Sequence, residues 1–293
     1  MLVDLVQTTT RDGLRLDGML QIPTISSQIG VDGFCLVHGT GGNFYSSTLF
    51  DAVAARLLDL GCAVLRVNTR GHDGISTAVA TQGGRRLGAA FEVVDDCRHD
   101  LAAWLDLLRT RAGSRVGLIG HSLGAVKCLY ALAHEPLLAP ACVVAISPPR
   151  LSYSWFCASS AAAEFLAIYH EAQRLVEAGQ PAALLDVKFP LPFAISAAGY
   201  VEKYGPDERY NYLPLLRSLA CPTLVTLGEV EMSNNVAFRD STQAIAEVRP
   251  QPAHLAVELI AGADHFYTGV RADLVARLEG WLRTSAVPIP EGP

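Results

Sequence analysis

The sequence predicts an α/β protein built on a doubly wound, mostly parallel central sheet. Three observations lead to this prediction: short apolar runs recur along the chain, helical stretches lie between them, and one long segment without strand signal interrupts the alternation. Continuous apolar runs of this kind are typical of strands buried on both faces, as in a parallel sheet. Their alternation with helices implies right-handed crossovers and helices on both faces of the sheet.

The N-terminal segment predicts a β-hairpin. Within the first twenty residues, an apolar strand and a partly alternating strand over residues 14–20 flank the turn Thr10-Arg11-Asp12-Gly13. After this hairpin the buried strands begin. We expect them at residues 34–37, 63–67, 116–119, 142–146, 223–227 and 255–259.

Between the strands, residues 96–111 predict an amphipathic helix, because their apolar positions recur at helical spacing on one face. These positions are Leu101, Trp104, Leu105 and Leu108. Asp95 or Asp96 is expected to cap the N-terminus of this helix.

The long segment between Ser147 and Thr223 carries no strand signal, and its residues 159–178 have helical periodicity. Prolines and glycines follow that helix and imply short pieces joined by turns. Six of the nine tyrosines lie here. Some of them pack the segment onto the sheet, and others are candidates to line an apolar pocket with polar tips.

The domain organisation follows from this interruption. We predict a core formed by residues 1–149 and 216–284, an inserted and mainly helical cap over residues 150–215, and a flexible tail over residues 285–293.

Composition limits the class of protein. Half of the 293 residues are hydrophobic and 18% are charged, as in a chain that buries a large core. The net charge of −6 gives no basic surface for nucleic acid. There is no apolar run of membrane-spanning length and no signal-peptide pattern. The seven cysteines are odd in number and lack C-x-x-C spacing, so we expect buried, reduced thiols in a cytoplasmic protein. The oligomeric state stays open, a homo-oligomer included.

A candidate nucleophile lies in the pentapeptide Gly120-His121-Ser122-Leu123-Gly124, which matches G-x-S-x-G. The motif follows the apolar strand over residues 116–119 and precedes a helical segment over residues 125–133. Strand, tight turn and helix are the setting in which this motif presents a serine oxygen above the carboxyl edge of a sheet. Ser122 is therefore the predicted nucleophile, and the backbone amide of Leu123 is a predicted oxyanion donor.

A hydroxyl nucleophile needs a general base that takes its proton, and the base needs an acidic side chain that orients it. His265 follows the last predicted strand, at the same edge of the sheet as Ser122, and is the predicted general base. The acid is expected in the loop after the preceding strand, which contains Glu229 and Glu231. Asp264 directly precedes the histidine and is poorly placed to reach its ring nitrogen.

These motifs resemble the α/β-hydrolase superfamily over nearly the whole chain, in the manner of a serine esterase or lipase with a cap. The resemblance implies the order serine, acid, histidine, and its Gly-x-x-Asp pattern begins at Gly228, which puts the acid at Glu231; Glu229 stays open as an alternative. The family's His-Gly loop is similar to His38-Gly39-Thr40 and implies a second oxyanion donor at the Thr40 amide. A phosphate-binding interpretation of this glycine-rich loop fits no phosphate motif.

A second familial stretch runs from Asn68 to Asp73 and is similar to Asp-x-Arg-Gly-x-Gly, from which it departs at both ends. We interpret its Arg70 and His72 as structural. The following glycine-rich loop contains Glu92, to which no role is assigned.

The expected function is hydrolysis of a carboxylic ester or thioester of a small to medium, moderately apolar molecule through an acyl-enzyme. No cofactor and no metal is expected, because the spacings H-E-x-x-H and C-x-x-C are absent. Carbon–carbon bond hydrolysis or a lyase reaction by the same triad remains an alternative, as does a ligand receptor with residual activity. Epoxide hydrolases and dehalogenases of the family have aspartate where this chain has Ser122.

Overall fold

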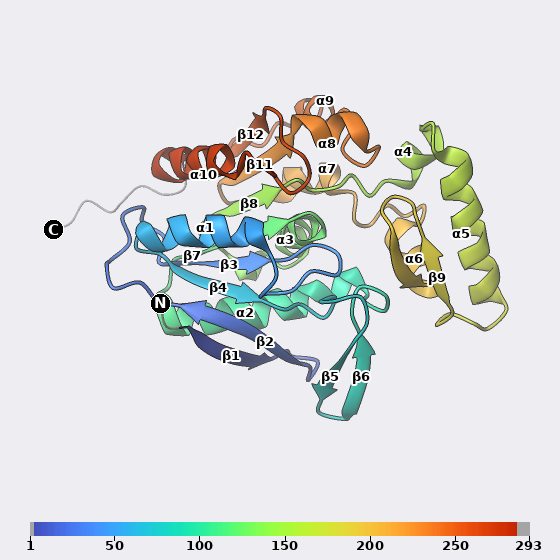
Figure 1. Cartoon of the computed structure of the whole chain (residues 1–293), viewed down its shortest axis with the longest axis horizontal. Coiled ribbons are helices and arrows are strands. Elements are labelled where there is room, and N and C mark those ends of the chain that lie inside the picture. The colour runs from blue at the N-terminus through green and yellow to red at the C-terminus, as the bar shows by residue number, and fades with distance from the viewer. Residues whose placement is uncertain (1–2, 286–293) are drawn as a thin grey trace.

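The computed structural model describes residues 3–285 and is organised around an eight-stranded sheet in the order β1-β2-β4-β3-β7-β8-β11-β12 (Figure 1). The strands from β4 to β12 in this order are parallel, whereas β2 is antiparallel to both β1 and β4. The strands are β1 (Asp4–Thr9), β2 (Arg15–Gln21), β3 (Gly33–Val37), β4 (Ala63–Val67), β7 (Val116–His121), β8 (Val143–Ile146), β11 (Thr223–Gly228) and β12 (Leu255–Ile260). The predicted fold class and the six predicted strands are confirmed, but only five of these strands are buried: β12 lies at the edge of the sheet, where Val257 and Leu259 are exposed.

One strand continues further than its apolar run. The expected strand over residues 116–119 extends through Gly120 to His121 in β7. Gly120 pairs with Val37 of β3, and His121 pairs with Ile146 of β8. Backbone pairing on both sides therefore carries the strand up to Ser122, although the side chains there are no longer aliphatic.

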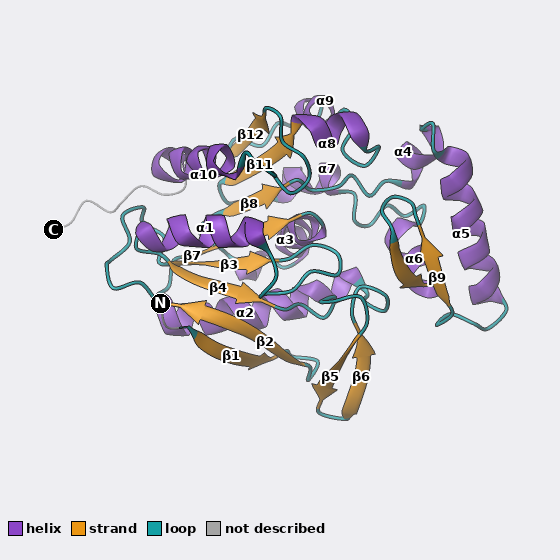
Figure 2. Ribbon diagram, in the orientation of Figure 1, coloured by secondary structure: helices purple, strands orange, loops and turns teal. Residues whose placement is uncertain are grey.

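Helices cover both faces of the sheet (Figure 2). On one face, α1 (Thr48–Asp59) and α10 (Arg271–Ser285) pack against each other and against the sheet. On the other face lie α2 (Cys97–Ala112) and α3 (Leu123–His134). These two layers bury apolar side chains above and below the parallel strands, which explains why those strands are apolar on both faces.

The predicted helix over residues 96–111 is α2, and its four predicted apolar residues are buried. The predicted side-chain cap is wrong. Asp96 occupies the cap position but makes no capping hydrogen bond, because its carboxylate binds Arg70 at 2.8 Å. The Asp95 carboxylate instead accepts hydrogen bonds from Arg98 and Tyr130.

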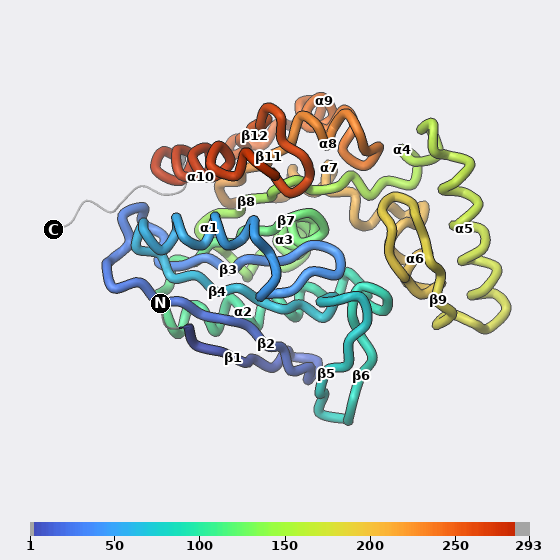
Figure 3. The backbone as a smooth tube through the Cα atoms, in the orientation of Figure 1, coloured from blue at the N-terminus to red at the C-terminus, as the bar shows by residue number. Residues whose placement is uncertain are grey.

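The segment between β8 and β11 lies beyond the carboxyl ends of the parallel strands, and the tube in Figure 3 shows it leaving and rejoining the core there. We call residues 150–215 the insert. It contains α4 (Tyr153–Ala158), α5 (Ala162–Glu177), β9 (Leu184–Val187), β10 (Phe193–Ser196), α6 (Ala197–Tyr204) and α7 (Tyr212–Leu215). The expectation of no strands here is wrong, because β9 and β10 form a short antiparallel hairpin.

Aromatic rings form the interior of the insert. Phe156 and Phe189 lie with ring centroids 5.0 Å apart, and Phe165 lies 5.3 Å from Phe156. Tyr200 and Tyr204 are buried beside them. For these residues packing within the insert, rather than lining of a pocket, accounts for the aromatic content.

Smaller elements complete the described chain. They are the hairpin of β5 (Ser76–Ala80) and β6 (Gly83–Leu87), together with α8 (Glu229–Asn234) and α9 (Ser241–Ala246). All seven cysteines are free, and five of them are buried. None of the described helices is both long and apolar enough to cross a membrane. Apart from Ser285, the predicted tail over residues 285–293 lies outside the described residues.

Candidate active site

Ser122 occupies a strained turn between β7 and α3. Its backbone has φ 57° and ψ −126°, a conformation that side-chain-bearing residues rarely adopt. The turn is tight enough that a Cβ atom on Gly124 would lie 2.1 Å from the carbonyl oxygen of Val37. Only glycine fits there, which explains the last position of the G-x-S-x-G motif. The turn places the Ser122 side chain at the carboxyl edge of the sheet, where the residue retains 6% exposure.

Glu231 and His265 are brought together from α8 and from the loop after β12. Glu231 Oε2 accepts a hydrogen bond from His265 Nδ1 at 2.8 Å, and Glu231 is 4% exposed. Its other oxygen, Oε1, accepts hydrogen bonds from the Gly228 amide at 2.7 Å and from the Ser147 hydroxyl. Both carboxylate oxygens are therefore fixed, and no hydrogen bond to His265 Nε2 is formed by the residues that the structure describes.

The alternative acids lie elsewhere. Glu229 is exposed, and its carboxylate accepts a hydrogen bond from the Gly262 amide at 2.9 Å. Asp264 accepts hydrogen bonds from the amides of Phe266 and Thr268, so it caps the turn that follows His265. Of the three carboxylates that the sequence offers, only Glu231 contacts the imidazole.

Three hydroxyl groups form a hydrogen-bonded chain that ends on Glu231 Oε1. Ser147 Oγ lies 2.9 Å from the Tyr267 hydroxyl, which lies 3.0 Å from Thr226 Oγ1. Because a carboxylate can only accept, Ser147 donates to Glu231, and the hydroxyls of Tyr267 and Thr226 can donate along the same direction. Burial raises the pKa of Tyr267, which keeps its proton on the phenol oxygen. Sequence reasoning missed this chain, since Ser147 follows β8, Thr226 lies within β11 and Tyr267 lies after β12, and only folding brings them together.

His265 lies among aromatic rings. Its ring centroid is 4.7 Å from that of His121 and 4.9 Å from that of Phe238. His121 Nε2 donates a hydrogen bond to the His265 carbonyl oxygen at 2.8 Å. Burial, reinforced by the neighbouring His265, lowers the pKa of His121 to about 3. His121 is therefore neutral near pH 7 and holds the loop that carries His265.

Ser122 and His265 are neighbours at this edge, since His121 directly precedes Ser122 and contacts His265. No hydrogen bond joins the Ser122 hydroxyl to His265 within residues 3–285. Catalytic hydrogen bonds are often long in ligand-free enzymes and shorten when substrate binds.

The loop after β3 lies against Ser122. A Cβ atom on Gly39 would be 2.8 Å from Ser122 Cβ, so only glycine allows this approach. The Gly39 carbonyl oxygen accepts hydrogen bonds from His38 Nδ1 at 2.8 Å and from the Gly42 amide at 3.1 Å. These two bonds fix the Gly39–Thr40 peptide, whose N–H points away from its C=O. Within the described chain the amides of Thr40 and Leu123 have no hydrogen-bond partner.

The protonation state of His38 follows from its partners. The Thr69 amide donates to His38 Nε2 at 3.1 Å, so that nitrogen is an acceptor and the ring proton is on Nδ1. Burial, together with the charge of Lys127, lowers the pKa of His38 to about 3. The ring is neutral and donates to the Gly39 carbonyl.

Arg70 is structural, as predicted. Its guanidinium is buried and contacts Asp100 at 2.7 Å, Asp96 at 2.8 Å and Asp12 at 3.0 Å, which ties the N-terminal turn to α2. His72 Nδ1 lies 2.9 Å from the neighbouring Asp73 carboxylate.

Glu92, which had no assigned role, is buried between Lys127 and Lys203. Burial alone would raise the pKa of Glu92, but the two lysine charges outweigh it and lower this pKa to about 2.

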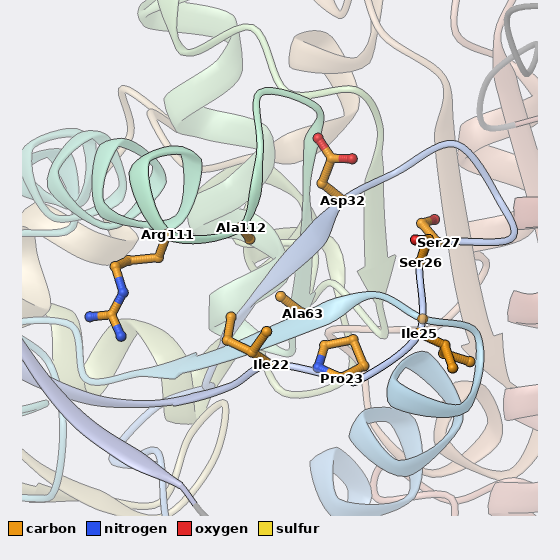
Figure 4. A pocket seen from close by; sticks show the side chains of 10 residues that line it. Ile22, Pro23, Ile25, Ser26, Ser27, Asp32, Ala63, Arg111 and Ala112 are labelled. Atoms are coloured by element: carbon orange, nitrogen blue, oxygen red, sulfur yellow. The ribbon is translucent and has the colours of Figure 1, made fainter. Parts of the chain in front are cut away.

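Elsewhere in the described chain, two kinds of feature bear on a second site: groups that could hold a metal ion, and pockets. Residues 3–285 contain no group of three His, Cys, Asp or Glu side chains placed to hold a metal ion. A surface pocket lies at the opposite ends of the parallel strands, where Asp32 precedes β3 and Ala63 begins β4 (Figure 4). It is separate from the edge that carries Ser122.

Comparisons with known proteins agree with this architecture. The Est1E protein of Butyrivibrio proteoclasticus, solved with ferulic acid bound, is similar at 16% identity with a TM-score of 0.65, over 96% of this chain and 99% of that one. An esterase of Pyrococcus furiosus is similar at 20% identity with a TM-score of 0.62, over 98% and 91%. The hydrolase GrgF of Penicillium sp. sh18 is similar at 16% identity with a TM-score of 0.67, over 98% and 99%.

No curated protein matches the chain. At these identities the similar structures establish the fold alone. The family model described as the alpha/beta hydrolase family matches residues 36–283, which is most of the chain. The chain therefore belongs to the alpha/beta hydrolase family.

Proposed function

We propose that the protein is a serine hydrolase that cleaves a carboxylic ester or thioester through an acyl-enzyme. Ser122 is the nucleophile, His265 the general base and Glu231 the acid of the triad. The observation that carries the proposal is the hydrogen bond between Glu231 Oε2 and His265 Nδ1, formed beside the strained turn at Ser122.

In the first half-reaction, Ser122 Oγ attacks the carbonyl carbon while its proton passes to His265 Nε2. The electron pair of the carbonyl bond moves onto oxygen, and the amides of Thr40 and Leu123 donate to that oxyanion. When the tetrahedral intermediate collapses, the bond to the alcohol or thiol breaks and His265 returns the proton to the leaving group. Water then repeats the sequence on the acyl-enzyme and releases the acid.

Glu231 acts through His265. Its carboxylate holds the proton on Nδ1, so that the Nε2 lone pair is available as base, and it stabilises the imidazolium that forms. Because Oε1 is held by Gly228 and Ser147, the carboxylate cannot rotate away from the ring.

We further propose that residues 1–149 and 216–284 form the catalytic core and that residues 150–215 act as a cap over the site. The position of the insert beyond the carboxyl ends of the strands supports this assignment. Phe238 and Phe266 lie beside His265, which favours a small to medium, moderately apolar substrate. Among the similar structures, one has ferulic acid bound and another is an esterase.

The test is hydrolysis of p-nitrophenyl esters from acetyl to long-chain acyl by the wild type, by Ser122→Ala and by Ser26→Ala as a matched control at an exposed serine. The proposal predicts turnover that Ser122→Ala lowers by roughly 10⁴-fold or more and that Ser26→Ala leaves unchanged. Ester turnover that survives in Ser122→Ala contradicts it. If no ester is turned over while a phosphonate labels Ser122, carbon–carbon bond cleavage becomes the better assignment.

A further inference from the structure

Two of the three lysines of the chain are buried against the same carboxylate. Lys127 Nζ lies 2.6 Å from Glu92 Oε2, and Lys203 Nζ lies 3.3 Å from Glu92 Oε1. All three side chains are at most 1% exposed. We call these residues the lysine–glutamate cluster. Its members come from the loop after β6, from α3 and from α6 of the insert, so the cluster joins the insert to the core.

Stabilisation of the fold alone does not explain why these three charged side chains are buried together. Removing three charged groups from water is costly, and buried ion pairs often stabilise a fold no better than apolar side chains of similar volume. The cluster has two cations for one anion, so its formal charge is +1; burial lowers the pKa of Lys203, and the charges of Glu92 and Glu202 oppose this shift. A buried positive charge near the proposed oxyanion hole stabilises the negative charge that develops there.

A continuous path of hydrogen bonds leads from the cluster to the loop that contacts Ser122. Lys127 Nζ donates to Thr69 Oγ1 at 3.1 Å, and Thr69 Oγ1 lies 3.2 Å from His38 Nε2. The ammonium can only donate, so Thr69 Oγ1 accepts from it and can donate its own proton to Nε2, whose lone pair it shares with the Thr69 amide. His38 Nδ1 then donates to the Gly39 carbonyl at 2.8 Å.

Every donor on this path points in the same direction. The path ends on the Gly39–Thr40 peptide, whose N–H is the proposed oxyanion donor. Hydrogen bonds aligned in this way polarise one another, and an amide whose carbonyl accepts a strong hydrogen bond is a better donor at its N–H. The path therefore both orients the Thr40 amide and strengthens it as a donor.

We propose that Thr69, Lys127 and Lys203 are positioning residues for the oxyanion hole. Through them, the packing of the insert against the core sets the orientation and donor strength of the Thr40 amide. This inference rests on the proposed function. Among residues 3–285, Lys203 contacts the path only through Glu92, so its influence on the site passes through Lys127 and Thr69.

The first experiment compares Thr69→Val with Thr69→Ser on the best p-nitrophenyl ester. Valine keeps the shape and removes the hydroxyl, whereas serine keeps the hydroxyl. We expect Thr69→Val to lower kcat about tenfold with KM changed by less than about twofold, a smaller loss than the 10²- to 10³-fold typical of a missing oxyanion donor. Thr69→Ser should restore most of kcat.

A second readout separates positioning from folding. A trifluoromethyl ketone forms a tetrahedral adduct with the serine and places an oxyanion in the hole. The inference predicts that Thr69→Val weakens this inhibitor by the same factor by which it lowers kcat. If kcat and inhibitor affinity of the folded variant equal those of the wild type and only Tm falls, Thr69 is structural and the inference is wrong.

The contribution of the insert is tested with Lys203→Met, with Lys188→Met as the matched control at an exposed lysine of the insert. Lys203→Met should lower kcat severalfold, Lys188→Met should not, and Lys203→Met should add nothing in the Thr69→Val background. Equal kcat in the two lysine variants, or additive losses in the double variant, overturns the inference. If Ser122→Ala retains ester turnover, the proposed function fails instead, so the two failures are distinguishable.

Discussion

Glu231→Gln keeps the shape of the triad acid and changes its hydrogen bonding. Glu231 Oε1 accepts from two donors, the Gly228 amide and the Ser147 hydroxyl, and Oε2 accepts from His265 Nδ1. A glutamine has a single oxygen, which the two donors will retain. Its NH₂ group then faces His265 and can only donate, so His265 must turn Nδ1 into an acceptor and move its proton to Nε2. The lone pair that should take the Ser122 proton is lost.

The size of the effect follows from that change of tautomer. In serine hydrolases whose triad acid is replaced by its amide, geometry is kept while the rate falls by about 10⁴-fold. Here the two competing donors on Oε1 enforce the wrong orientation, so we expect kcat/KM to fall by about 10³- to 10⁴-fold, or about 4 to 5.5 kcal/mol of transition-state stabilisation.

The assay is ester hydrolysis at pH 7, with Glu229→Gln as the control. Glu229 is the other acid of the same loop, and its carboxylate binds only the Gly262 amide among the described residues. Glu229→Gln should keep kcat/KM within about threefold of the wild type, since a surface substitution away from the site changes little. A Glu231→Gln variant with near-normal activity, or a large loss in Glu229→Gln, refutes the assignment of the acid.

Three further predictions follow from the same structure. Ser147→Ala removes one donor from Glu231 and should lower kcat about tenfold without loss of fold, as measured by ester kinetics and circular dichroism; unchanged kcat contradicts the positioning role. Gly124→Ala forces a Cβ atom against the Val37 carbonyl and should cost more than about 3 kcal/mol in urea unfolding, whereas Gly280→Ala in α10, with open space around it, should be neutral or stabilising. Because the pKa of Glu92 is lowered to about 2, its contribution to stability is full above about pH 4.5 and is lost as the pH falls toward 2. Lys203→Met removes one of the two charges that lower the Glu92 pKa. The unfolding free energy of this variant should therefore differ from that of the wild type more at pH 7 than at pH 3. A difference that is the same at both pH values contradicts this account.

The fold could be predicted because its strands are apolar on both faces. Parallel strands between two layers of helices are mostly apolar, and such runs are visible in a single sequence, although Arg66, Thr223 and Thr226 are buried polar exceptions. The hairpin of β9 and β10 gave no such signal, since Leu184–Val187 is short and only Val187 in it is buried. Its pairing comes from tertiary contacts that local pattern does not encode.

In the candidate site, too, some residues could be predicted from the sequence and others could not. Ser122 and His265 follow from motif and chain position, but Glu229 and Glu231 are two residues apart and equivalent by type. Folding separates them, because a carboxylate three residues after Gly228 can reach back to the Gly228 amide and face His265. Glu92 gained no role from the sequence, because its partners Lys127 and Lys203 are distant in the chain.

The central claim is that Ser122 becomes acylated during turnover. Rapid quenching of the protein with a p-nitrophenyl ester in acid, followed by peptide mass spectrometry, measures this directly. We predict an added acyl mass on the peptide that contains Ser122, a burst of p-nitrophenol of about one equivalent when deacylation is slow, and neither in Ser122→Ala. Ester turnover with no acyl group on Ser122, or an acyl group on another residue, would contradict the account.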